Sequence, residues 1–204
     1  MIANYYFLAF LPFLISCSNV QANSQQKIRN KLSVTEATEK DSLSKKIVYD
    51  FYTWYVYNEY PKRRSYYRNA PFKKFNDNTY GLDIEVFKER LEEISFFSES
   101  FKDMLIQENI ECHKKILEVD WGGINPELEA DFNISNCFYR WSNDWFGGQE
   151  DGVYDFKLLP QLKKEGEKYI YTVQSLINGI KFNQYKIVVI KENEEYKIDL
   201  IERL

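Results

Sequence analysis

The spacing of apolar residues predicts a helical first half for the domain. An apolar stripe starting at Leu43 predicts a helix from Asp41 or Ser42 to about Asn58. A longer stripe from Ile84 to Leu105 recurs every three to four residues over six turns, with Asp83 in position to cap its start. A third helical piece is expected over about Glu108 to Val119. The polar segment around Asn76-Asp77-Asn78 predicts a long connection before Asp83.

The period changes from helical to two in the last third of the chain. Alternating residues predict strands over Val153–Leu159, Tyr169–Gln174, Tyr185–Ile190 and Tyr196–Ile201. Asn178-Gly179, flanked by Ile177 and Ile180, is typical of a type I′ hairpin turn. Helices followed by an antiparallel meander indicate an α+β domain with the helices packed on one face of the sheet.

Composition supports one domain with an aromatic core. The 204 residues include 16 Tyr, 15 Phe and 4 Trp, and each buried aromatic side chain contributes about 150–250 Å² of buried surface. The net charge is −4. Lys62-Arg63-Arg64 is the one dense basic cluster, which we interpret as a solvated loop. A mildly acidic chain of this kind lacks the clustered basic surface that nucleic-acid binding requires, so no nucleic-acid partner is expected.

The first residues indicate export. Tyr5–Ile15 holds no charged residue and is too short for a transmembrane helix, which needs about 20 apolar residues. Leu14-Ile15-Ser16-Cys17 resembles the lipobox of bacterial lipoproteins. That resemblance implies a signal peptide over 1–16, lipid on Cys17 and a membrane as partner. Cys17 is followed by Ser18 rather than by Asp, which resembles lipoproteins that are sorted to the outer membrane and face the periplasm. The alternatives are a secretory signal cut after Ala22 and an uncleaved apolar anchor.

The polar residues 17–40 are interpreted as a flexible tether, which leaves 41–204 as a single α+β domain. Cys112 and Cys137 remain once Cys17 is assigned to the lipid. In an exported protein this pair is either a disulfide or two buried thiols. Two cysteines and His113 are too few and wrongly spaced for zinc, so neither a metal nor a cofactor is expected.

Several segments resemble a family of small exported bacterial proteins, the domain of unknown function 3828 family. The resemblance lies in Val48–Tyr55, in Asp120 with its Gly/Pro-rich continuation, and in the closing strand pair, and it covers about residues 43–203. It implies a fold similar to nuclear transport factor 2 and to cystatin, in which a curved sheet wraps a helical layer and leaves a pocket. The family implies no catalytic residues.

The segment from Asp120 to Asp151 is the candidate binding region, because long segments without regular structure are uncommon unless functional. Its aromatic residues are of the types enriched at binding hot spots. The alternative is that most of these rings complete the core. The ligand-binding candidates are Trp121, Tyr139, Arg140, Trp141, Asp144, Trp145 and Phe146.

Catalytic motifs are weak. His113 lacks the surroundings of an acyl-transfer triad, and the adjacent Cys112 and His113 do not face each other on a helix. Paired carboxylates in a glycosidase arrangement are the one enzymatic hypothesis; they would come from Glu127, Glu129, Asp131, Asp144, Glu150 and Asp151. We therefore expect a non-catalytic, lipid-anchored envelope protein that binds a small ligand, a protein or a glycan, an immunity protein or inhibitor being one version. An enzyme acting on envelope glycans and a structural envelope protein are the alternatives.

Overall fold

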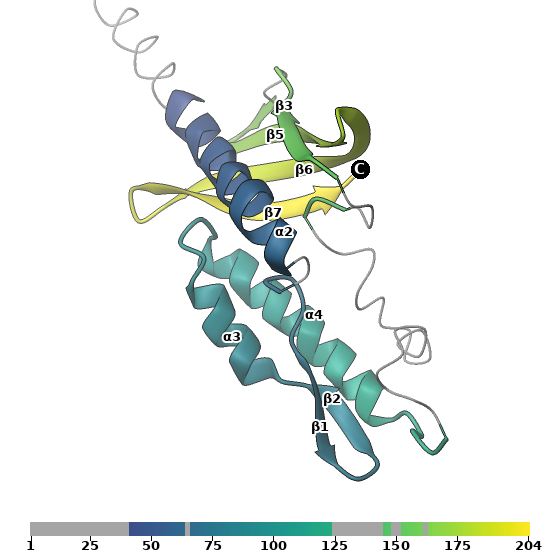
Figure 1. Cartoon of the computed structure of the whole chain (residues 1–204). Coiled ribbons are helices and arrows are strands. Elements are labelled where there is room, and N and C mark those ends of the chain that lie inside the picture. Colours follow the sequence, from purple (N-terminus) through teal and green to yellow (C-terminus); the bar gives the residue numbers. More distant parts are fainter. Residues whose placement is uncertain (1–40, 64–65, 124–144, 148–151, 161–162) are drawn as a thin grey trace, which may run out of the picture. The chain divides into compact units, whose positions relative to one another are not determined.

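The computed structural model describes residues 41–63, 66–123, 145–147, 152–160 and 163–204 (Figure 1). Residues 41–54 are α-helical, and the helix continues as the π-helix η1 (Tyr55–Glu59) and the short α2 (Tyr60–Arg63). We call residues 41–63 the N-terminal helix. Its predicted apolar face is confirmed at Val48, Phe51 and Tyr52, which are fully buried, but not at Leu43, the first residue of the predicted stripe, which is 49% exposed.

A hairpin follows where the polar pattern predicted only a connection. Strands β1 (Phe72–Asn76) and β2 (Thr79–Leu82) pair antiparallel. The sequence gives no signal for this hairpin, because Lys73 to Asn76 are all exposed and β1 therefore shows no apolar alternation. Figure 1 shows the hairpin beside α4, and the two are joined where the backbone N–H of Leu82 donates to Nδ1 of His113 at 2.8 Å.

The long apolar stripe forms two helices rather than one. α3 (Ile84–Glu92) begins at the predicted cap, where the Asp83 carboxylate accepts from the backbone N–H of Val86. α4 (Glu99–Leu117) begins at Ser98, and it incorporates the predicted third helical piece. The expectation of one continuous helix to Leu105 was therefore wrong. Residues 93–98 keep the apolar spacing because Ile94 and Phe97 are buried, although neither lies in a helix.

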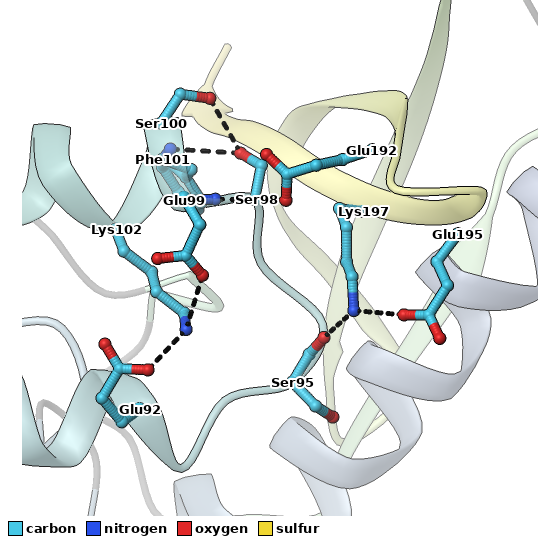
Figure 2. Close-up of polar contacts among 10 residues, drawn as sticks. All are labelled: Glu92, Ser95, Ser98, Glu99, Ser100, Phe101, Lys102, Glu192, Glu195 and Lys197. Atoms are coloured by element: carbon cyan, nitrogen blue, oxygen red, sulfur yellow. Dashed lines mark hydrogen bonds and ion pairs between the residues drawn. The ribbon is translucent and has the colours of Figure 1, made fainter.

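The segment between α3 and α4 leaves the helical path to pair with the sheet. The backbone N–H of Ser98 donates to the carbonyl of Ile198 at 2.9 Å, and that of Ile198 donates to the carbonyl of Phe96 at 2.8 Å. The Ser98 hydroxyl also accepts from the backbone N–H of Phe101, which caps α4 (Figure 2). Backbone groups freed by ending α3 are thus satisfied by a strand and by a cap.

Charged side chains also stabilise the segment between α3 and α4. Lys102, which is 6% exposed, forms ion pairs with Glu92 at 3.0 Å and Glu99 at 3.1 Å (Figure 2). Burial alone would lower the pKa of Lys102, but the two carboxylates outweigh it and raise the pKa above its ordinary value. Lys197 bridges the carbonyl of Ser95 and the carboxylate of Glu195.

Asp199 of β7 connects the start of α4 to the sheet. One of its oxygens accepts from the hydroxyl of Ser98 at 2.8 Å and from that of Ser100, and the other pairs with Lys168 at 3.5 Å. Burial disfavours the charged carboxylate, but these hydrogen bonds and the lysine hold the pKa of Asp199 below its ordinary value. The carboxylate is therefore ionised at neutral pH and holds α4 against the sheet.

The C-terminal part is an antiparallel sheet of five strands. They are β3 (Tyr154–Leu158), β4 (Lys163–Glu165), β5 (Lys168–Ile177), β6 (Ile180–Glu192) and β7 (Glu195–Arg203), in the order β3-β5-β6-β7 with β4 also pairing with β5. The predicted strands are confirmed within a few residues. Asn178 and Gly179 both have positive φ, as the predicted turn type requires.

The core lies where the N-terminal helices meet this sheet. Alternate residues of β5 and β6 are buried, including Tyr171, Val173 and Ile187. The helices contribute Phe51, Phe97 and others, so that the α+β class and its packing of helices on an antiparallel sheet are confirmed. Among the described residues, none of the helices has the length and apolar character needed to cross a bilayer.

Candidate functional site

Three of the predicted ligand-binding residues lie in described parts of the chain, and all three are buried. Trp121 is 5%, Trp145 2% and Phe146 0% exposed. The Trp121 ring packs against Phe72 and Tyr80 of the β1–β2 hairpin, and its Nε1 donates to the carbonyl of Ile116. Tyr139, Arg140, Trp141 and Asp144 lie outside the described residues, so their role in binding stays a prediction.

Trp145 is the ring around which the core aromatics gather. Its centroid lies 4.9 Å from that of Phe97, 5.4 Å from Tyr55 and 5.8 Å from Phe51. The backbone carbonyl of Trp145 accepts a hydrogen bond from the hydroxyl of Tyr52 at 3.2 Å. These contacts give Trp145 a clear role in core packing, which is the alternative that the sequence had left open for the aromatic segment.

Of the three cysteines, Cys112 alone lies in a described part of the chain. Cys112 lies on α4, half-buried and packed against the hydrophobic core. Cys137 and the lipobox residue Cys17 lie outside the described residues. The disulfide and the lipid attachment therefore stay predictions.

The carboxylates of the glycosidase hypothesis, from Glu127 to Asp151, also lie outside the described residues. Within the parts of the chain that the structure does describe, no three His, Cys, Asp or Glu side chains come together as a metal site. The enzymatic alternative stays a hypothesis without support from a described contact.

His113 has a structural role that its sequence context did not reveal. Because Nδ1 accepts from the backbone N–H of Leu82, that nitrogen is unprotonated, and burial lowers the pKa of the imidazole below its ordinary value. The ring fits against Gly81, where an added Cβ would lie 2.6 Å from Cε1 of His113. His113 is thus a neutral contact between α4 and β2.

Two exposed aromatic rings of the N-terminal helix form a different surface. Tyr49 is 55% exposed and Tyr57 48% exposed, and both pack against the ring of Phe156 from β3, which is itself only 9% exposed. The Phe156 centroid is 5.4 Å from that of Tyr49 and 5.9 Å from that of Tyr57. We call Tyr49, Tyr57, Phe156 and the neighbouring Asp155 the tyrosine ridge.

A hydrogen bond fixes the orientation of one ridge tyrosine. The hydroxyl of Tyr57 donates to Oδ1 of Asp155 at 2.5 Å, and the backbone N–H of Phe156 donates to the same oxygen at 2.7 Å. Burial, this hydrogen bond and the nearby negative charge of Asp155 together raise the pKa of Tyr57 to about 12. The phenol is therefore protonated and held in place over the neutral pH range.

The ridge follows from the local sequence of the helix. Tyr49, Thr53 and Tyr57 follow one another at intervals of four, so they lie on one side. Phe51, Tyr52 and Tyr55, placed between them, face the core. The π-helical turn at Tyr55–Glu59 includes Tyr57 and contacts β3, and such turns occur frequently at functional sites. The interval of Tyr49 and Tyr57 is the one sequence signal that marks the ridge.

The ridge has the chemistry of a recognition surface. Exposed phenol faces pack on flat apolar groups such as the face of a sugar ring, a proline or another aromatic ring. The oxygen Oδ2 of Asp155 accepts no hydrogen bond from any of the described residues, so it is available to a ligand hydroxyl or amide. Because the Tyr57 ring is already held by the Asp155 carboxylate, its binding to such a ligand would cost little side-chain freedom.

Comparisons with protein-family models, with curated proteins and with solved structures find no match to this chain.

Proposed function

We propose that this chain is a non-catalytic lipoprotein of the cell envelope that binds a ligand through the tyrosine ridge. In this proposal Cys17 carries the lipid, and the protein lies at the outer membrane, facing the periplasm. The ligand is a glycan, a small molecule or a protein segment that presents a flat apolar face. An immunity protein or inhibitor is one version of this function.

The observation that carries the proposal is that two tyrosine rings, each about half exposed, pack against the ring of Phe156. A large apolar ring left in water forgoes the free energy that burial provides, about 1.5–3 kcal/mol for a fully buried side chain. Tyr57 is in addition held by Asp155, which reduces the conformational entropy lost when a ligand binds. Aromatic residues that are both exposed and ordered are characteristic of binding surfaces.

The finer assignment of the fold is part of the same proposal. A sheet in which β5, β6 and β7 are consecutive antiparallel neighbours, preceded by helices, is compatible with the nuclear transport factor 2-like and cystatin-like resemblance. In such folds the helices and the curved sheet enclose a pocket. The resemblance to the domain of unknown function 3828 family is proposed on the same grounds, together with Val48–Tyr55.

The binding proposal is tested with purified envelope components. The mature chain, residues 17–204, is assayed for co-sedimentation with cell-wall glycan and, separately, for capture of defined envelope peptides on a sensor surface. We expect a component that binds the native chain to bind Tyr49→Ser/Tyr57→Ser at least tenfold more weakly, because both stacking faces are lost. Phe75→Ser is the matched control, since Phe75 is 49% exposed and lies elsewhere, on β1.

Two outcomes would contradict this function. Equal binding by the double variant and the native chain would show that the ridge is not the binding surface. Release of soluble sugar products from the cell-wall glycan during the assay would show that the protein is an enzyme.

The anchor is tested by a separate measurement. Cells that produce the full chain are grown with a labelled fatty acid, and the protein is examined by mass spectrometry for acyl groups on its N-terminal residue. We expect label on the native chain and none on Cys17→Ser. An unlabelled native chain that begins after Ala22 would show a secreted protein instead.

A further inference from the structure

β3 lies at one end of the strand order in the five-stranded sheet, and among the described residues it pairs with β5 alone. The backbone N–H of Asn178 donates to the carbonyl of Val153, and the backbone N–H of Leu159 donates to the carbonyl of Thr172, both at 2.9 Å. Val153 and Leu159 thus bond toward β5, and in an antiparallel pair the residues that do so alternate along the strand. The even-numbered residues of β3 therefore direct their backbone groups away from β5.

Two of these residues carry backbone groups that no neighbouring strand satisfies. The N–H of Phe156 donates to Oδ1 of Asp155 at 2.7 Å, so a side chain takes the position of a strand there. The carbonyl of Phe156 and both backbone groups of Leu158 form no hydrogen bond with any of the described residues. Lys157, which lies between them, is exposed. The groups left at this edge have the spacing of a β-ladder and can pair with another strand.

The other edge of the sheet is closed. The N–H of Ser98 donates to the carbonyl of Ile198, and the N–H of Ile198 donates to the carbonyl of Phe96, so the segment between α3 and α4 covers β7. An unpaired edge strand is a template for association, and proteins usually cover or block it. Within the described parts of the chain, no segment pairs with the outer side of β3 at Leu158. The contrast indicates that β3 is the edge at which a further strand can pair.

The tyrosine ridge adjoins this edge. The hydroxyl of Tyr57 donates to the same Asp155 oxygen that accepts from the N–H of Phe156. The side chains of Phe156 and Leu158 both pack on the hydrophobic core, on the face of β3 that meets the helices. A residue that paired with Leu158 would present its side chain on that same face. It would lie near the rings of Tyr49 and Tyr57, which contact Phe156 two residues away.

We propose that the ligand of the tyrosine ridge is an extended polypeptide segment that adds to the sheet along β3. The segment exchanges backbone hydrogen bonds with Leu158 and donates to the carbonyl of Phe156, and its apolar side chains pack against the ridge. This inference rests on the proposed function and narrows its ligand to a peptide strand. A glycan or a small molecule lacks the alternating N–H and carbonyl groups that match such an edge.

A second copy of β3 fits this edge less well than a chain of different sequence. In a symmetric antiparallel pair with Leu158 opposite Leu158, the carbonyl of Phe156 would lie opposite Pro160, which has no N–H. With Leu158 opposite Phe156 of the other copy, the two Lys157 side chains would lie directly opposite each other. Like charges in that position are destabilising. The pairing segment is therefore assigned to a different polypeptide.

The test uses random peptides as the probe. A phage-displayed library is selected on residues 17–204, which include every residue that the structure describes. Selected peptides are synthesised, and their dissociation constants are measured by fluorescence anisotropy. Each peptide amide is then methylated in turn, which removes one donor and leaves the protein unchanged. We expect methylation at alternate residues of the pairing segment to weaken binding roughly tenfold and methylation at the intervening residues to change it less than about twofold.

A protein variant tests the same contact from the other side. Leu158→Pro removes the edge N–H, and proline is tolerated on an edge strand where that N–H faces away from the sheet. Leu158→Ala is the matched control, since it shortens the same side chain and keeps the N–H. We expect Leu158→Pro to weaken peptide binding roughly tenfold or more and Leu158→Ala to weaken it less than about threefold. Circular dichroism checks that both variants keep the native fold.

Three results would overturn the inference. The first is a library that yields no peptide that binds the native chain. The second is methylation that is tolerated at every residue, which would show that a peptide binds through its side chains alone. The third is a native dimer, detected by ultracentrifugation, that Leu158→Pro dissociates, because the edge would then belong to a second copy of the chain.

The ridge is scored separately from the edge in the same assay. Sensitivity to methylation at alternate residues, together with undiminished binding by Tyr49→Ser/Tyr57→Ser, would support strand pairing and contradict the proposed function. Loss of binding by this double variant, with methylation tolerated at every residue, would support the ridge and contradict strand pairing. A failure of the inference is thus distinguished from a failure of the proposed function.

Discussion

The buried cluster around Trp145 and the tyrosine ridge use the same kinds of side chain for opposite purposes. In the cluster, Phe51, Phe97 and Trp145 are at most 2% exposed and contact one another from the helix, the α3–α4 segment and residues 145–147. On the ridge, Tyr49 and Tyr57 are about half exposed. The N-terminal helix contributes rings to both sets, Phe51 to the cluster and Tyr49 and Tyr57 to the ridge.

The difference between the two regions lies in what satisfies the polar end of each tyrosine. The buried Tyr52 donates to a backbone carbonyl, which needs no charge, whereas the exposed Tyr57 donates to the carboxylate of Asp155. A buried carboxylate would have to lose most of its hydration, at a cost of several kcal/mol. For these two tyrosines the partner of the hydroxyl follows the exposure of the ring, but this is no rule for the whole core, because the buried Tyr67 donates to the carboxylate of Glu93.

The largest contrast is expected from truncating one ring in each region. Trp145→Ala should lower the free energy of unfolding by about 3–5 kcal/mol, since it leaves a cavity among four other aromatic rings. Tyr49→Ala should lower it by under about 1 kcal/mol. Urea unfolding followed by circular dichroism measures both. Similar losses in the two variants would remove the distinction between core and ridge.

A smaller loss is expected at the glycine that follows the cluster. Gly147 has a φ of +60°, and an added Cβ would lie 2.3 Å from Nδ2 of Asn183 and 2.5 Å from the hydroxyl oxygen of Tyr185. Gly147→Ala should cost about 2–4 kcal/mol, from backbone strain and crowding. Gly166→Ala is the matched control, because its φ is +61° and no atom lies within 4 Å of the added Cβ. We expect Gly166→Ala to lower the free energy of unfolding by about 1–2 kcal/mol. Equal losses in the two variants would show that Asn183 and Tyr185 move aside for the added Cβ without cost.

Removing one hydroxyl from each region compares the two hydrogen bonds directly. Tyr52→Phe leaves the carbonyl of Trp145 without this donor in a buried site, and should cost about 1 kcal/mol. Tyr57→Phe removes an exposed contact and should change the free energy of unfolding by less than about 0.5 kcal/mol. Thermal unfolding of the two variants against the native chain is the measurement. A larger loss for Tyr57→Phe would mean that the ridge is a stabilising element.

The smallest expected effect is a shift in the pH at which the Tyr57 phenol titrates. The pKa of Tyr57 is raised from 10.0 to about 12, so its contact with Asp155 contributes fully below pH 10 and is lost as the pH rises through about 12. The ultraviolet absorbance of the phenolate, compared between native chain and Tyr57→Phe, isolates this group. We expect Asp155→Asn to lower the midpoint toward 10. An unchanged midpoint in Asp155→Asn would show that Asp155 does not hold the phenol.

The sequence predicted the sheet well because half-buried strands show their period directly. In β5 the buried residues Tyr169, Tyr171 and Val173 alternate with partly exposed ones, and the Asn178-Gly179 turn fixes the pairing with β6. The β1–β2 hairpin went unpredicted because β1 is largely exposed and because its partners, His113 and Trp121, lie far along the sequence. Contacts between residues so far apart in the sequence leave no local pattern of apolar and polar positions.

The break between α3 and α4 shows a second limit of pattern reasoning. Apolar spacing reports which residues are buried, and Ile94 and Phe97 are buried in a non-helical segment that pairs with β7. The candidate site shows the same limit, since Trp145 and Tyr57 are both aromatic residues beside polar ones in the sequence. Tertiary packing encloses Trp145 among Phe51, Tyr55 and Phe97 and leaves Tyr57 about half exposed.

The pairing of residues 96–98 with Ile198 has a consequence for solubility. β7 ends the order of strands at one side of the sheet, and an unpaired strand edge is a template for association with other chains. The hydrogen bonds of Phe96 and Ser98 occupy the middle of that edge, and the carboxylate of Glu192 accepts from the backbone N–H of Glu99 close by. The sheet is thus protected at this edge against association with the strands of other chains.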